Sequence, residues 1–110
     1  IGRNGHIAFN EPGSSIKSRT RFVYLQEETR RDAVQDFGNL GAVPKKALTM
    51  GISTILETRK IILVATGKEK SDIIKKVIEG KVSETVPASF LQKHAHVLVV
   101  LDKEAGSLLQ

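Results

Sequence analysis

The sequence contains no cysteine and no tryptophan among its 110 residues. Without cysteine the chain has no disulfide framework, no catalytic thiol and no zinc–cysteine site, and this fits a reducing, cytoplasmic compartment. No apolar run approaches the roughly 20 residues that a membrane-spanning helix needs. The sequence therefore predicts no transmembrane helix and no membrane partner.

Aromatic residues are scarce as well: there are four Phe and one Tyr, and none is interleaved with a run of basic residues. The 17 Lys and Arg exceed the 12 Asp and Glu and give a net charge of +5, but they are scattered along the chain. Proteins that bind nucleic acids usually gather such charge in one stripe beside aromatic platforms. We therefore expect no nucleic-acid partner. His94 and His96 lack further ligands nearby, so we expect no metal site.

The remaining composition is that of an ordinary globular chain, with 40% hydrophobic and 26% charged residues. At 110 residues the chain is at most one domain. It begins without methionine, directly in the glycine-rich turn of residues 2–5, and a turn needs a scaffold on both sides. We therefore expect a C-terminal piece of a longer protein; a chain that starts at a natural boundary is the alternative.

The first half of the chain is predicted to hold few regular elements. Residues 1–20 are rich in turn-forming residues and read as a loop, and residues 21–25 are short and β-prone, as in a strand. Residues 27–37 are predicted to form a helix that begins with two acidic residues and is stopped by Gly38. In residues 47–56 the apolar spacing favours a helix over the second half.

Two continuous apolar runs, residues 61–65 and 97–101, predict strands buried on both faces. Between them, residues 73–78 carry the apolar stripe of a helix that Gly80 ends, and Pro87 opens a short helix over 89–94. The order strand–helix–strand with unbroken apolar strands is typical of a parallel sheet in an α/β fold. Such a sheet needs helices on both faces, and this chain is too small to supply them, which again favours a fragment.

Acid–base chemistry is the first candidate function, in the loop that carries Asn4, His6 and Glu11. Histidine exchanges protons near neutral pH, and a carboxylate hydrogen-bonded to an imidazole selects its tautomer and raises its basicity. Glu11, five residues after His6, reaches back if the loop curls. The alternative is a surface histidine in a polar loop.

Anion binding is the second candidate, in the turn Gly67-Lys68-Glu69-Lys70, which follows an apolar strand and opens a helix. Ligands of open parallel sheets bind at the carboxyl ends of strands, and helix N-termini favour anions. The turn lacks the Walker A pattern, so it favours a monophosphate on a small substrate over a nucleoside triphosphate. The alternative is a solvated basic turn.

Residues 2–12, Gly-Arg-Asn-Gly-His-Ile-Ala-Phe-Asn-Glu-Pro, resemble the signature of the glucosamine-6-phosphate deaminase (glucosamine-6-phosphate isomerase) family. The similarity continues through residues 18–21, 43–44, 47–51, 65–70, 79–80, 86–89, 91–92 and 94–102, and so covers almost the whole chain. The sister 6-phosphogluconolactonases share Gly-His but typically continue it differently from residues 7–12.

The resemblance implies a Rossmann-like α/β sandwich with a mainly parallel sheet flanked by helices. Residues 1–110 would be the C-terminal part of this single domain, without its N-terminal half. The implied enzyme, of the hydrolase class, converts glucosamine 6-phosphate and water to fructose 6-phosphate and ammonia in amino sugar catabolism, without a cofactor. A homo-oligomer is compatible with the resemblance. The carboxylate that removes the carbon-2 proton lies in the family's N-terminal half, so the fragment alone is expected to be inactive.

Site residues follow from the resemblance position by position. His6 corresponds to the base for ring opening, Glu11 to its acidic partner, and Asn4 to a position where many members have aspartate. Lys70 corresponds to a ligand of the substrate phosphate. The family's second phosphate-binding cation, an arginine, corresponds to Gln35, and Arg31 lies one helical turn earlier on the same face.

An allosteric phosphate pocket of some members would use Ser14 and Arg21. Its lysine corresponds to Val23, which argues against activation by an acetylated amino sugar phosphate.

Two other functions are compatible with these residues. One is another sugar-phosphate enzyme of the same fold, such as a 6-phosphogluconolactonase, against which the pair Asn10-Glu11 argues. The other is a non-catalytic domain that senses a sugar phosphate. Such a sensor needs binding but no acid–base group, so the presence of both His6 and Glu11 argues against it.

Overall fold

The computed structural model describes all residues, Ile1–Gln110. Its strands are β1 (Arg21–Tyr24), β2 (Lys46–Thr49), β3 (Ile61–Ala65) and β4 (Val97–Leu101). Its α-helices are α1 (Glu27–Asp32), α2 (Val34–Phe37), α3 (Ile52–Leu56) and α4 (Ser71–Ile78). Three 3-10 helices complete the list: η1 (Leu40–Ala42), η2 (Lys68–Lys70) and η3 (Pro87–Lys93). None of the helices has the length and the apolar character needed to cross a membrane.

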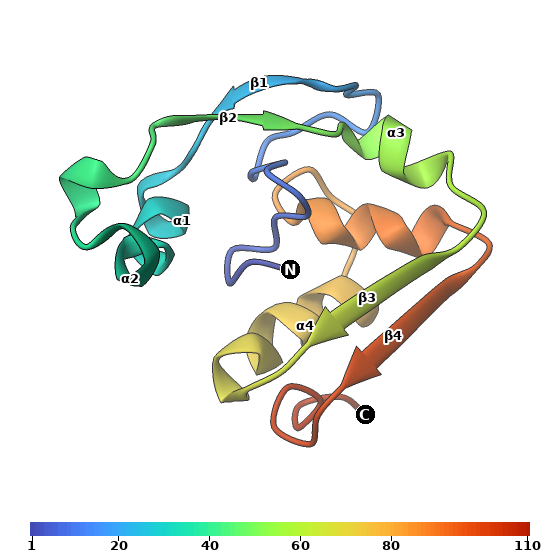
Figure 1. Ribbon diagram of the computed structural model, residues 1–110. Coiled ribbons are helices and arrows are strands. Elements are labelled where there is room, and N and C mark those ends of the chain that lie inside the picture. Colours follow the sequence, from blue (N-terminus) through green and yellow to red (C-terminus); the bar gives the residue numbers. More distant parts are fainter.

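The strands β3 and β4 form a parallel pair, with Ile61 opposite Val97 and Ala65 opposite Leu101. They cover the two apolar runs residue for residue, so both strand predictions and the parallel α/β prediction are confirmed. The crossover between them contains α4 and η3, which pack against each other on one side of the pair (Figure 1). Burial of the apolar side of this crossover stabilises the arrangement.

The main core cluster lies between the inner face of the β3–β4 pair and the two crossover helices. Its fully buried members include Ile74 of α4 and Ala88 of η3. Ile7 is the one member that the N-terminal loop supplies. This contact anchors the loop on the crossover and so places the candidate site relative to the sheet.

The opposite face of the β3–β4 pair is open. Ile62 and Val64 are 58% and 56% exposed, and Leu98 and Val100 beside them are 47% and 45% exposed. Within residues 1–110 the strands are therefore covered on one face only, because the helices of this crossover pack on one side. This open face agrees with the expectation that the chain is too small to cover both faces of the sheet.

The strands β1 and β2 form a separate antiparallel pair, with Arg21 opposite Thr49. The strand prediction for residues 21–25 is confirmed, but β2 was not predicted, since residues 47–56 were expected to be helical only in their second half, where α3 lies. The predicted helix over residues 27–37 is interrupted at Ala33. There the N–H of Ala33 bonds to the carbonyl of Arg30 and the N–H of Asp36 to that of Ala33, a tighter spacing than in an α-helix.

The N-terminal loop runs between the β1–β2 pair and the crossover helices (Figure 1). The N–H of Ala88 donates to the carbonyl of Gly5 at 2.9 Å, and the N–H of Phe9 donates to the Thr49 hydroxyl at 3.0 Å. The loop is thus fastened to both parts of the structure, as a loop that carries functional side chains must be.

Candidate active site

A tight turn over residues 7–10 brings Glu11 back to His6. The N–H of Asn10 donates to the carbonyl of Ile7 at 3.0 Å. Ala8 in the turn has a φ of 49°, the left-handed region that non-glycine residues rarely occupy. As the sequence predicted, the loop curls, and Nδ1 of His6 lies 3.1 Å from Oε1 of Glu11.

Three oxygen atoms surround Nδ1 of His6. The side-chain oxygen of Asn4 lies 2.7 Å away, Oε1 of Glu11 3.1 Å away and the Thr29 hydroxyl 3.3 Å away. A neutral imidazole carries one proton, and a hydrogen-bond acceptor holds that proton on the nearer nitrogen. The geometry therefore assigns the proton to Nδ1 and leaves the lone pair on Nε2.

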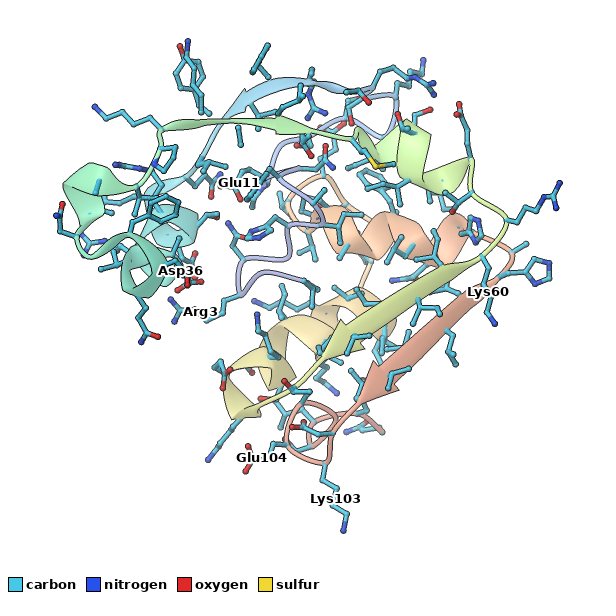
Figure 2. All side chains as sticks on the ribbon, in the orientation of Figure 1. Arg3, Glu11, Asp36, Lys60, Lys103 and Glu104 are labelled. Atoms are coloured by element: carbon cyan, nitrogen blue, oxygen red, sulfur yellow. The ribbon has the colours of Figure 1, made fainter.

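The Glu11 carboxylate is buried, with 7% of the residue exposed. Its oxygens accept hydrogen bonds from the Gln26 N–H at 2.6 Å, the Thr29 hydroxyl at 2.8 Å and the Asn4 amide at 3.2 Å. In Figure 2, Glu11 lies among the inner side chains, whereas Lys103 and Glu104 extend outward near the C-terminus. Three hydrogen bonds from separate segments fix the orientation of this carboxylate.

Sequence reasoning missed Gln26 and Thr29. Gln26 immediately precedes α1, and the first N–H groups of a helix have no partner within it, so the predicted helix start was a usable signal for a carboxylate ligand. Thr29 lies one turn into α1 and is 7% exposed. Nothing in its local sequence marks it, since its role depends on the approach of the loop.

Burial lowers the pKa of His6 below its ordinary value of 6.5 and outweighs the nearby Glu11 charge, which acts to raise it. The positive charge of Lys70 also lowers the pKa. Glu11 thus raises the pKa of His6, as expected, but desolvation of the charged imidazolium is the larger effect. At neutral pH the imidazole is consequently neutral, and its Nε2 lone pair can accept a proton, as a base requires.

Gly2 leaves room for the His6 ring. A Cβ atom at this position would lie 2.0 Å from Cε1 of His6, well inside any possible contact. The glycine at the start of the signature thus has a steric reason, because any side chain would displace the imidazole from Asn4 and Glu11.

His6 and Lys70 line one cavity of about 510 Å³, which also contains Thr29, Asp32 and Asp36 of the α1–α2 segment. The remaining wall is largely apolar and is formed by Ile1, Gly2, Ala8, Phe9, Leu25, Ala33, Phe37, Val43, Pro44, Lys46 and Ala47. Its size is that of a small-molecule site. The structure therefore brings together the two candidates that the sequence located far apart.

Lys70 is presented by the turn at the end of β3. Gly67 there has a φ of 92°, and its N–H donates to Oδ2 of Asp102 at 2.9 Å. Asp102 follows β4, so one carboxylate ties together the carboxyl ends of both parallel strands. Hydrogen bonds from the N–H groups of Ala105 and Gly67 lower the pKa of Asp102. Nζ of Lys70 donates to the carbonyl of Ile1 at 2.7 Å.

A second, polar hollow of about 410 Å³ adjoins the first at Lys70 and Asp32. Gln35, which stands at the position of the family's second phosphate-binding arginine, lines this hollow. Arg31, one turn earlier, and Arg3 line it as well. Both arginines already have carboxylate partners, Arg31 with Glu27 and Arg3 with Asp32. Lys70 is the cation of this hollow without an ion pair.

The structure also brings Ser14 and Arg21 together. Nη2 of Arg21 donates to the Ser14 hydroxyl at 3.3 Å, and Nη1 donates to the Asn10 side chain at 2.9 Å. Val23, the position expected to carry the lysine of an allosteric pocket, lies two residues further on β1. His94 makes structural contacts, with Nε2 2.7 Å from the carbonyl of Thr58 and Nδ1 accepting from the His96 N–H.

Comparison with known proteins places residues 1–100 in the family described as glucosamine-6-phosphate isomerases/6-phosphogluconolactonase. Glucosamine-6-phosphate deaminase 1 of Bacillus subtilis is 54% identical over 108 residues, which are 98% of this chain and 45% of that protein. Glucosamine-6-phosphate deaminase of Streptococcus pyogenes is 50% identical over 109 residues, or 99% of this chain and 47% of the relative. The chain thus spans less than half the length of these relatives.

Solved structures agree with this assignment. A monomeric glucosamine-6-phosphate deaminase superposes with a TM-score of 0.96 at 54% identity, over 98% of this chain and 45% of that one. The 6-phosphogluconolactonase of Trypanosoma cruzi superposes with a TM-score of 0.73 at 25% identity, over 100% of this chain and 39% of that one. The resemblance noted in the sequence and the Rossmann-like α/β fold that it implies are confirmed.

Proposed function

Since the chain belongs to the glucosamine-6-phosphate isomerase/6-phosphogluconolactonase family, we propose that its function is the isomerising deamination of glucosamine 6-phosphate. The products are fructose 6-phosphate and ammonia. One observation carries this proposal: a neutral, partly buried His6, oriented through Nδ1 by Glu11 and Asn4, lines the same cavity as the cation Lys70. Ring opening of a phosphorylated sugar needs a base, and binding of its phosphate group needs a cation.

In the proposed mechanism, Nε2 of His6 accepts the proton of the anomeric hydroxyl while the bond between carbon 1 and the ring oxygen breaks. The imidazolium then returns this proton to the ring oxygen, which leaves the open-chain aldehyde. Glu11 stabilises the imidazolium that forms, at 3.1 Å from Nδ1. Asn4 accepts a hydrogen bond at 2.7 Å from the same nitrogen but contributes no charge, so Glu11 is the nearby carboxylate that acts on His6. Lys70 binds the phosphate group as a point charge. The reaction needs no cofactor.

Removal of the carbon-2 proton is assigned to a carboxylate outside these residues. We propose that residues 1–110 form the C-terminal part of a single α/β domain, and that this part alone is inactive. The open face with Ile62, Val64, Leu98 and Val100 supports the proposal, because four neighbouring aliphatic side chains at half exposure favour a covering segment. The relatives, more than twice as long, have the chain length to supply one.

The class of enzyme in this proposal is a deaminase and isomerase, as the relatives are named. Those names give no support to the hydrolase class. The relative of known structure is monomeric, and both the oligomeric state and the cytoplasmic location of this protein stay predictions.

A 6-phosphogluconolactonase is the second candidate, because a lactonase shares the fold at a TM-score of 0.73. The deaminases are favoured by their 54% identity, against 25% for the lactonase. A sugar-phosphate sensor is disfavoured by the cost of burying Glu11 with three hydrogen-bond donors around it, an arrangement that binding alone does not require.

The experiment is steady-state kinetics of the full-length protein with glucosamine 6-phosphate, with ammonia and fructose 6-phosphate both measured. We expect turnover by the natural protein and a decrease in kcat of about 10²- to 10⁴-fold in His6→Gln, the usual contribution of general acid–base catalysis. His96→Gln is the matched control, since His96 is exposed and its ring makes no hydrogen bond.

If the protein hydrolysed 6-phosphogluconolactone and released no ammonia from glucosamine 6-phosphate, the lactonase function would replace the proposed one. An unchanged kcat with a raised KM in His6→Gln would assign His6 to binding.

A further inference from the structure

Asn10 is completely buried, at 0% exposure, and every hydrogen-bonding group of its side chain has a partner. Its amide nitrogen donates to the carbonyls of Ile7 and Met50, at 2.9 and 2.8 Å. Its side-chain oxygen accepts from Nη1 of Arg21 at 2.9 Å. Asn10 therefore closes the turn between His6 and Glu11, and Arg21 satisfies the one acceptor that remains.

The second arm of the same guanidinium reaches the other side of Glu11. Nη2 of Arg21 donates to the Ser14 hydroxyl at 3.3 Å, and that hydroxyl donates to the backbone carbonyl of Glu11 at 2.7 Å. One side chain thus contacts residue 10 before Glu11 and residue 14 after it. This bridging geometry matches the planar fork of arginine and cannot be reproduced by a single ammonium.

Arg21 makes these contacts without an ion pair. Arg3, Arg19 and Arg31 each pair with a carboxylate, whereas no carboxylate oxygen lies within 4.0 Å of the Arg21 guanidinium. Its hydrogen-bonding capacity is directed to the loop and to the carbonyl of Arg19.

The partner of Arg21 in the β1–β2 pair is Thr49, and Thr49 holds the same loop. Its hydroxyl accepts from the N–H of Phe9 at 3.0 Å, and the next carbonyl, of Met50, accepts from Asn10. The end of the antiparallel pair therefore fastens residues 9–14 from both strands. The turn that it fastens contains Ala8 at a φ of 49°, a conformation that persists only where the surroundings impose it.

From these contacts we propose that Arg21 is a positioning residue for the Glu11–His6 pair: it fixes the loop on both sides of Glu11 and so sets the distance from that carboxylate to the imidazole. The proposal rests on the proposed function, in which this pair opens the sugar ring. In this role Arg21 contacts the loop directly, and no bound phosphate beside Ser14 is required.

Arg21→Met in the full-length protein tests the proposal, because it keeps the aliphatic stem and removes every donor. We expect kcat for glucosamine 6-phosphate to decrease by about 10- to 100-fold with KM within a factor of about three, as a small misplacement of catalytic groups produces. Arg21→Lys, with a single ammonium nitrogen in place of the fork, is expected to recover part of the loss. Arg19→Met is the matched control, since Arg19 pairs with exposed Glu57 on the surface.

A second readout follows His6 itself and needs no activity. The ¹⁵N resonances of the imidazole report its tautomer and its pKa in each variant. In residues 1–110 the charges that act on His6 are Glu11 and Asp32, which raise its pKa, and the Ile1 amino group and Lys70, which lower it. If Arg21→Met lets Glu11 move away, the pKa of His6 decreases further and the preference for the proton on Nδ1 weakens, whereas Arg19→Met leaves both unchanged.

Equal kcat in Arg21→Met and Arg19→Met, with unchanged His6 resonances, overturns the proposal. Loss of folding in Arg21→Met moves the decision to Arg21→Lys, and a folded Arg21→Lys with natural kcat and natural resonances overturns it too. A natural protein without deaminase activity refutes the proposed function, while the resonances still decide whether Arg21 positions the pair.

Discussion

Residues 61–105 supply eight of the nine side chains in the main core cluster, and residues 1–60 supply only Ile7. Four of the seven buried non-glycine side chains of the first region are polar: Asn10, Glu11, Thr29 and Thr49. The crossover region is thus held by burial of apolar surface, and the site region by hydrogen bonds between loop, strand and helix.

This difference suits what each region does. Apolar burial is non-directional and scales with area, so it stabilises a scaffold but does not orient a single atom. A hydrogen bond adds a modest net free energy but demands a specific geometry. The imidazole of His6 needs that geometry on the Nδ1 side, and the site region provides it through Asn4, Glu11 and Thr29.

Truncation of the apolar core tests the crossover region and has the largest expected effect on stability. Ile74 is fully buried in α4, so Ile74→Ala should lower the free energy of unfolding by about 2–5 kcal/mol. Denaturant titration measures the loss, and kcat at temperatures where the variant is folded should stay close to the natural value. Ile78→Ala on the same helix is the control, because Ile78 is 37% exposed. Equal losses in both variants would contradict the core assignment.

Loss of one hydroxyl tests the site region. Thr29→Val keeps the shape of the side chain but removes the donor to Glu11, and a hydrogen bond to a charged group contributes about 1.5–3 kcal/mol. We expect stability to fall by this amount and kcat/KM to fall as well, because Glu11 loses a contact that orients it. Thr54→Val is the matched control, since the Thr54 hydroxyl is buried without a partner. The control should be neutral or more stable, and a reversed order of the two variants would refute this reading of the polar region.

The pH dependence of kcat/KM is expected to change least, but it tests the balance between burial and the Glu11 charge directly. Burial lowers the pKa of His6 from 6.5, so the base stays unprotonated below that pH and kcat/KM should fall only as the pH drops through the lowered pKa. Glu11→Gln removes the charge that raises the pKa and should move this acid limb to still lower pH, with a lower plateau. Glu104→Gln removes an exposed carboxylate that has no ion pair, and it serves as the control. An acid limb above pH 6.5 would mean that Glu11 outweighs burial.

The elements that sequence reasoning predicted are those with a local pattern. The runs 61–65 and 97–101 became β3 and β4, and the stripe over 73–78 lies in α4. The strand β2 was missed because its four residues alternate in exposure without a long apolar run. The break at Ala33 was missed because it consists of two i to i−3 hydrogen bonds that no residue type marks.

The site was predicted to a similar extent. His6, Glu11, Asn4 and Lys70 stand in recognisable loops. The structure brings His6 and Lys70 to one cavity, with Asn4 and Glu11 in contact with His6; their catalytic roles stay predictions. Gln26, Thr29 and Asp102 were not found, because each acts across 15 or more residues of sequence.

The sequence by itself determined the residue types for acid–base chemistry, the order of strand, helix and strand, and the family, because these depend on local spacing and identity. Only the tertiary structure decided the direction of the His6 pKa, the proton on Nδ1, and the binding of Arg21 to both sides of Glu11. Burial and hydrogen-bond geometry are properties of atoms brought together from distant segments. They exist only when the N-terminal loop, the β1–β2 pair and α1 have packed against one another.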